Sequence, residues 1–186
     1  MKLLIKNARL AFPVLFAPEK FQGQGEWAYT CTLLLPQDHP QIAEIEEAIK
    51  SVARDKWPKN YEQIIKLAKA KDNYTLHDGD LKDLDGYAGC YYINARTSGR
   101  NGAQPVRPTI LNRDRTPLTI EDGRPYAGCY VNASIELWAQ DNGYGQKVNA
   151  SLRGVQFYRD GDAFAGGSAA SQDEFESLAV EDEALV

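Results

Sequence analysis

The chain has 186 residues, of which 43% are hydrophobic and 25% charged, values typical of a soluble globular protein. This length fits one domain, or one domain with a tail. No apolar run approaches the roughly 20 residues that span a bilayer. The N-terminal stretch is broken by Lys2, Lys6 and Arg9, so it does not resemble a signal peptide. We therefore expect a cytosolic protein with no membrane partner.

The net charge of −5 is unevenly distributed along the chain. The segment Ser171 to Val186 has no base and six acids: Asp173, Glu174, Glu176, Glu181, Asp182 and Glu183. The rest of the chain has 21 bases and 20 acids and is nearly neutral. We expect a folded domain over residues 1–165, and a flexible linker with a disordered acidic tail over 166–186.

The tail has two features that suggest binding. Its acids can mimic a nucleic-acid strand and compete for a cationic groove on the same chain. Its end places apolar Leu185 and Val186 after a run of acids, which suits docking into a basic-rimmed pocket of a partner protein. The alternative is a tail that only increases solubility.

The first third of the chain predicts strands followed by helices. Leu3 to Phe16 reads as one or two strands interrupted at Pro13, and Trp27 to Leu35 as a strand with Trp27 and Tyr29 on its core face. Asp38 is the expected N-cap of a helix that runs to Trp57.

After a second helix near Tyr61 to Lys71 and a polar connector, the chain returns to strands. These are expected at Tyr87–Thr97, Val106–Leu111, Cys129–Gln140 and Gln146–Tyr158, with a hairpin turn at residues 141–143. This order predicts a mainly β (α+β) protein: an antiparallel barrel with a two-helix insertion over about residues 38–72. The pentapeptide at 87–91 recurs at 126–130, which we interpret as two strands that enter one barrel in similar ways.

Enzyme signatures are mostly absent. The sequence has no phosphate-binding glycine loop, no nucleophile elbow and no zinc-protease motif. We expect no catalytic residue, no cofactor and no metal, and we interpret Cys31, Cys90 and Cys129 as buried apolar residues. One metal candidate remains, the cluster Asp78, Asp80, Asp83 and Asp85. It is either a solvated acidic loop or the site of a metal-dependent nuclease.

The alternation of the strands gives the clearest functional signal. Three strands each have an apolar face and a polar face that carries an aromatic residue, a base or both: Tyr92, Asn94 and Arg96; Tyr130 and Trp138; Lys147 and Arg153. Further arginines follow in the loops: Arg100, Arg107, Arg113 and Arg115. Exposed rings beside cations are what binding of single-stranded DNA without sequence preference requires, because rings stack on bases while cations follow the phosphates. The alternative is that these rings pack beneath the helices.

Two segments, residues 126–145 and 148–167, resemble a family of tailed-phage single-stranded DNA-binding proteins typified by one from an Enterobacter phage. The resemblance extends over nearly the whole chain. It implies an OB-fold barrel related to the helix-destabilising proteins of podophages, acting in the cytoplasm of the infected bacterial host. It also implies that the acidic tail regulates binding and recruits phage or host replication or recombination proteins. This tail ends in Leu-Val instead of an aromatic residue.

Two questions stay open at this point. A virion structural protein is a further alternative, against which the acidic tail argues. Exposed edge strands can pair protomers, so the sequence also allows a homo-oligomer.

Overall fold

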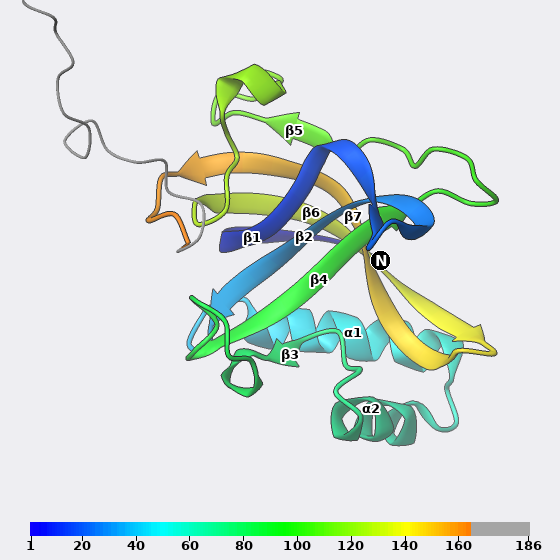
Figure 1. Cartoon of the computed structure of the whole chain (residues 1–186). Coiled ribbons are helices and arrows are strands. Elements are labelled where there is room, and N and C mark those ends of the chain that lie inside the picture. Colours follow the sequence, from blue (N-terminus) through cyan, green and yellow to red (C-terminus); the bar gives the residue numbers. More distant parts are fainter. Residues whose placement is uncertain (165–186) are drawn as a thin grey trace, which may run out of the picture.

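The computed structural model describes residues 1–164 and shows a closed five-stranded barrel. The barrel strands are β1 (Lys2–Phe21), β2 (Gln24–Pro36), β4 (Cys90–Ser98), β6 (Tyr130–Asn142) and β7 (Gly145–Arg159). Short strands β3 (His77–Asp78) and β5 (Thr109–Leu111) pair with β4 and β7, and η1 (Gly79–Leu81) and η2 (Ile120–Asp122) are single 3₁₀ turns. Helices α1 (Ile42–Lys56) and α2 (Tyr61–Ala70) lie together on one side of the barrel (Figure 1). The mainly β barrel with two inserted helices is thus confirmed.

The core follows the expected alternation of the strands. In β6, Val131, Ala133, Ile135 and Leu137 are all buried, and the residues between them face outward. The apolar stripes of both helices join the same cluster, so the helices close one side of the barrel interior. Within residues 1–164 no helix is long and apolar enough to cross a membrane.

The barrel closes between β4 and β7 with little backbone pairing. The two strands share one parallel pair, Ala95 with Ala150, so the barrel is mixed and not wholly antiparallel. On either side of this pair a threonine hydroxyl donates to a β7 carbonyl: Thr75 Oγ1 to Val148 O at 2.6 Å and Thr97 Oγ1 to Leu152 O at 2.5 Å. We call these three contacts the closing seam. Farther along the same edge of β7, β5 pairs with Gly154 to Gln156.

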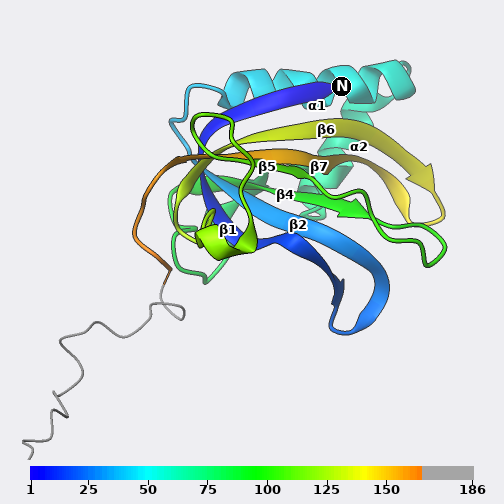
Figure 2. The same ribbon diagram turned by 90° about the horizontal axis from the view of Figure 1, so that it is seen from above.

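Strand β1 is longer than the sequence indicated. It passes through Pro13 and reaches Phe21, with a register shift between Ala11 and Val14 and a positive φ of 46° at Phe12. The β-bulge at this point accommodates Pro13, because proline has no backbone N–H to donate and the ladder is interrupted there. The β1–β2 hairpin therefore projects well beyond the barrel (Figure 2).

Helix α1 begins later than predicted, with Gln41 at the N-cap position and not Asp38. The reason is a side-chain clamp onto β1. Gln41 Nε2 donates to Leu4 O at 3.0 Å, and the backbone N–H of Lys6 donates to Gln41 Oε1 at 2.8 Å. Residues 37–41 are thereby held against the barrel, and the helix starts only after them.

The turns that precede β4 and β6, and the turn between β6 and β7, lie close to where the sequence predicts them. The repeated pentapeptide forms matching turns before β4 and β6, in which Cys90 N donates to Tyr87 O and Cys129 N donates to Tyr126 O, both at 3.1 Å. The similar entry of two strands into one barrel is therefore confirmed. The β6–β7 hairpin turns at Gly143 and Tyr144, slightly later than predicted, because the ladder continues to the pair Asn142–Gly145.

The closing seam gives a test of stability. Thr97→Val keeps the side-chain shape but leaves the Leu152 carbonyl without its hydroxyl donor, which should lower the free energy of unfolding by about 1–3 kcal/mol. Thr97→Ser keeps the donor and should lose less, although serine is the poorer strand former. Urea unfolding measures both variants. A valine variant at least as stable as the serine variant would show that the hydroxyl does not hold the seam.

Candidate nucleic-acid interface

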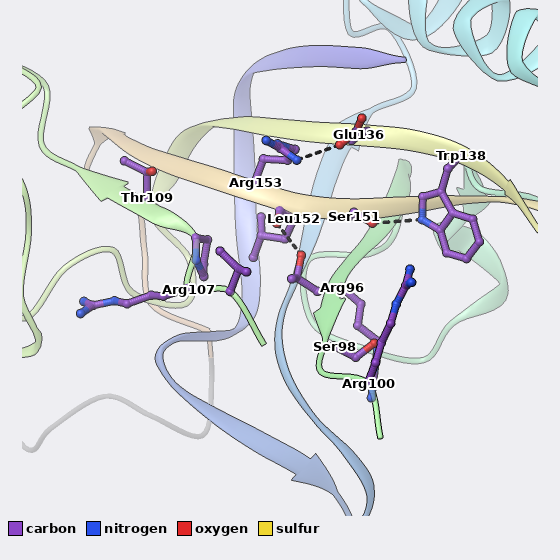
Figure 3. A pocket seen from close by; sticks show the side chains of 13 residues that line it. Arg96, Ser98, Arg100, Arg107, Thr109, Glu136, Trp138, Ser151, Leu152 and Arg153 are labelled. Atoms are coloured by element: carbon purple, nitrogen blue, oxygen red, sulfur yellow. Dashed lines mark hydrogen bonds and ion pairs between the residues drawn. The ribbon is translucent and has the colours of Figure 1, made fainter. Parts of the chain in front are cut away.

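A groove of about 740 Å³ opens on the outer surface of the barrel where β4 diverges from β7. It exists because β4 leaves β7 after Ala95, whereas β5 joins β7 only at Gly154, so that Ser151 to Arg153 lie between the two. We call it the arginine groove. Its lining residues are Arg96, Thr97, Ser98, Arg100, Val106, Arg107, Pro108, Thr109, Glu136, Trp138, Ser151, Leu152 and Arg153 (Figure 3).

The groove is strongly cationic. Four arginines line it, against a single acid, Glu136. Arg153 Nη1 lies 2.8 Å from Glu136 Oε2, and this ion pair is half-exposed. Arg96 Nη2 donates to the carbonyl of Glu26 at 3.3 Å, and the Arg107 guanidinium lies 5.6 Å from the Phe16 ring centroid. Three guanidinium groups therefore have no carboxylate partner among residues 1–164, and they can bind the phosphates of an incoming strand.

Trp138 supplies an aromatic surface within this cationic groove. Its side chain is 44% exposed, and its Nε1 donates to Ser151 Oγ at 3.0 Å, which fixes the ring against the neighbouring strand. Arg96 and Arg100 lie across the groove from it, and Arg107 lies toward the far end (Figure 3). No helix residue lines the groove, so the alternative that this ring packs beneath the helices is wrong.

The β1–β2 hairpin positions one wall. Gly99 N donates to Trp27 O at 2.9 Å, and Gly102 N contacts both carboxylate oxygens of Glu26, at 3.2 and 3.4 Å. These bonds hold the loop that carries Arg100. No sequence pattern predicts this contact, because Glu26 and Gly102 are 76 residues apart in the chain.

Tyr92 occupies a different environment from the one predicted. It shares the outer face of β4 with Asn94 and Arg96, but its side chain is only 4% exposed. Its ring stacks on His77 at 4.7 Å and meets Tyr87 edge-on at 5.1 Å. Residues 77–87 thus cover this end of β4, and the prediction that Tyr92 offers a free ring to a base is not met by this conformation.

The remaining predicted residues lie outside the arginine groove. The Arg159 guanidinium covers the Tyr130 ring at 3.5 Å, and Arg113 lies 6.0 Å from the Tyr158 ring centroid. Arg115 is exposed in the turn after β5, with a positive φ of 69°. Asn94 and Lys147 line a second hollow, described below. Arg96, Arg100, Arg107, Trp138 and Arg153 are therefore the predicted residues that the fold brings together.

The acidic connector, residues 78–85, makes hydrogen bonds that stabilise the fold. Asp78 accepts from Asp80 N at 3.0 Å, and Asp80 accepts from Gly89 N at 2.6 Å and from Gln37 Nε2 at 3.0 Å. These bonds pin the connector to the start of β4. Residues 1–164 contain no cluster of three or more histidine, cysteine or acidic side chains that could hold a metal ion.

The cysteines are free thiols. Cys31 and Cys129 are buried as expected, whereas Cys90, also expected in the core, is only partly buried; burial raises the pKa of Cys31 to about 12 and that of Cys129 to about 11. Their thiolate forms are therefore scarce near neutral pH, as expected for small apolar core residues.

Comparison with known proteins identifies the lineage of this groove-bearing barrel. A protein family described as the Enterobacter phage Enc34 ssDNA-binding protein matches residues 1–185. The chain belongs to this family. The Enc34 family consists of DNA-binding proteins, not enzymes, and the nuclease alternative has no support in it.

Relatives of known sequence or structure agree with membership of the Enc34 family. Protein p50 of Acyrthosiphon pisum secondary endosymbiont phage 1 is 45% identical over 186 residues, covering 98% of this chain and 97% of that protein. The single-stranded DNA-binding protein of bacteriophage Enc34, solved in complex with ssDNA, is 28% identical with a TM-score of 0.70, covering 88% of this chain and 89% of that one. Bacteriophage T7 gp2.5, at 14% identity and a TM-score of 0.55 over 92% and 97% of the two chains, shares the fold.

The charge of the arginine groove can be measured without DNA. Of the three tryptophans, Trp57 is buried and Trp27 half-buried, whereas Trp138 is exposed beside arginines. We expect the ratio of iodide to caesium quenching of Trp138 fluorescence to exceed that of free N-acetyltryptophanamide, because the cationic groove concentrates anions. Trp138→Phe should remove most of the iodide-sensitive emission, while Trp57→Phe should not. A ratio no higher than that of free N-acetyltryptophanamide would contradict a cationic groove.

Proposed function

We propose that this protein binds single-stranded DNA in the arginine groove, without sequence preference and without catalysis. The observation that carries the proposal is the exposed Trp138 ring, held by Ser151 among arginines. The chain's homology to phage single-stranded DNA-binding proteins, one of them solved in complex with ssDNA, supports it.

Two interactions contribute to binding: stacking of bases on an aromatic ring and attraction between arginines and phosphates. A base stacks on the indole of Trp138, while Arg96, Arg100 and Arg107 bind phosphates as the strand passes. Every base has an aromatic face, so stacking tolerates any sequence. In a duplex the faces are already stacked on neighbouring bases, which favours the unpaired strand.

We further propose a role in phage DNA replication, recombination or repair in the cytoplasm of the infected host. The predicted tail residues, from Asp173 to Val186, lie outside the described residues. Their six acids and the cationic groove are complementary in charge. The tail then weakens binding by competing with DNA, and its Leu185–Val186 end recruits replication or recombination proteins.

Trp138→Ala tests the stacking contribution. Loss of one base–ring contact should cost about 1–3 kcal/mol, a drop in affinity of about 5- to 150-fold for oligo-dT. Fluorescence anisotropy at fixed salt measures it, with Tyr61→Ala on α2 as the control because that aromatic residue lies outside the groove. If the two variants bind equally well, Trp138 does not stack on DNA.

Deletion of Ser171 to Val186 tests the tail. Removing six acids and no base should tighten binding to oligo-dT, and the difference should shrink as salt rises, because screening weakens the competition. A matched variant with the acids changed to their amides should behave like the deletion. Unchanged or weaker affinity in both variants would exclude tail competition.

A further inference from the structure

A second hollow, of about 250 Å³, lies on the other side of the closing seam from the arginine groove. Its lining differs in chemistry: it has no arginine, and three of its residues carry side-chain amides. The lining residues are Asn73, Tyr74, Thr75, His77, Asn94, Lys147, Val148, Asn149 and Ala150. We call it the amide groove.

The two grooves are consecutive along one outer face of the barrel. In β7, Lys147 and Asn149 line the amide groove, and the next residues on the same face, Ser151 and Arg153, line the arginine groove. Six residues of strand separate Lys147 from Arg153, a distance of about 20 Å at about 3.3 Å per residue. That length is about six nucleotides at the 3.4 Å rise of a stacked strand.

The same succession occurs on the neighbouring strand β4. In β4, Asn94 lines the amide groove and Arg96 the arginine groove. In β6, Trp138 lies directly opposite Asn149 in the ladder, so the stacking ring stands at the junction of the two grooves. A strand stacked on Trp138 can therefore continue across the seam without leaving the surface.

Two amides in the second groove are held in fixed orientations. Asn94 Oδ1 accepts from Thr32 Oγ1 at 2.8 Å, which leaves the amide N–H groups of Asn94 as donors. Asn149 Nδ2 donates to Gln140 Oε1 at 2.9 Å, which leaves its oxygen as an acceptor. A donor and an acceptor on facing strands are suited to the polar edges of unpaired bases.

Lys147 supplies the charge. Its ammonium donates to Asn73 Oδ1 at 3.3 Å, and its remaining donors can bind a phosphate. Asp72, which precedes Asn73 in the chain, lies 3.1 Å from His77 and 3.4 Å from Lys82, so it opposes a phosphate less than an unpaired carboxylate would.

We propose that the amide groove is a second DNA subsite, in which Asn94 and Asn149 bind base edges and Lys147 binds a phosphate of the strand that leaves Trp138. This inference rests on the proposed function, because it extends the path of the same strand. It assigns the arginine groove to stacking and phosphate binding, and the amide groove to polar contacts with the bases.

The test is a series of oligo-dT lengths, from about four to about sixteen nucleotides, the range of site sizes known for OB barrels. Anisotropy is measured for full-length protein and for Lys147→Ala, Asn149→Ala and Trp138→Ala. Lys66→Ala, an exposed lysine on α2 outside both grooves, is the matched charge control. Circular dichroism melting checks that each variant is folded.

The expected result is a loss that depends on length. Lys147→Ala and Asn149→Ala should each weaken binding of the longer oligonucleotides by about three- to tenfold, the size of one or two hydrogen bonds, and leave the shortest unchanged. Trp138→Ala should weaken binding at every length. An equal loss at all lengths, or a loss matched by Lys66→Ala, would overturn the second subsite, as would no loss at any length. If Trp138→Ala also has no effect, Trp138 does not stack on the strand; if the full-length protein binds no oligo-dT at any length, the proposed function itself fails.

Discussion

The closing seam is the constraint on which the rest of the structure depends. A barrel must join its last strand to an earlier one, and here that joint is one parallel pair, Ala95 with Ala150, flanked by two threonine hydroxyls. Because hydroxyls satisfy the carbonyls of Val148 and Leu152, the barrel closes without a long β4–β7 ladder. Buried backbone carbonyls need such partners, since leaving one without a partner costs about 1–3 kcal/mol.

The sparse joint also creates the proposed binding surface. A full ladder would hold β4 flat against β7, whereas a single pair lets β4 diverge toward the β1–β2 hairpin and leaves room for β5 to pair farther along. The arginine groove is the space between them, and the amide groove lies on the other side of the same pair. Barrel closure and the proposed DNA path are thus consequences of one local arrangement.

Strand alternation predicted much of this surface. Because side chains alternate across a strand, the polar faces of β6 and β7 could be read from the sequence, and Trp138 and Arg153 do meet in one groove. The rest depended on contacts between distant segments. Tyr92 lies on the predicted face but beneath His77, and no periodicity reveals that residues 77–87 fold back over β4.

The positions of the loop arginines also could not be predicted from the sequence. Arg100 and Arg107 reach the groove because Glu26 and Phe16 of the long hairpin lie beside them, whereas Arg113 and Arg115 lie past β5 and outside it. In the sequence these four arginines lie close together and are indistinguishable as candidates. Asp38 was a plausible N-cap by residue type, but the clamp of Gln41 on β1 moves the start of α1.

The most direct measurement of the central claim is photo-cross-linking of the full-length protein to oligo-dT that carries 5-iodouracil, followed by mass spectrometry of the peptides. The account predicts adducts on Trp138 and on the neighbouring residues of β7, abolished by unlabelled single strand and not by duplex. Adducts confined to the helices, or to the covered rings of Tyr92 and Tyr130, would contradict it.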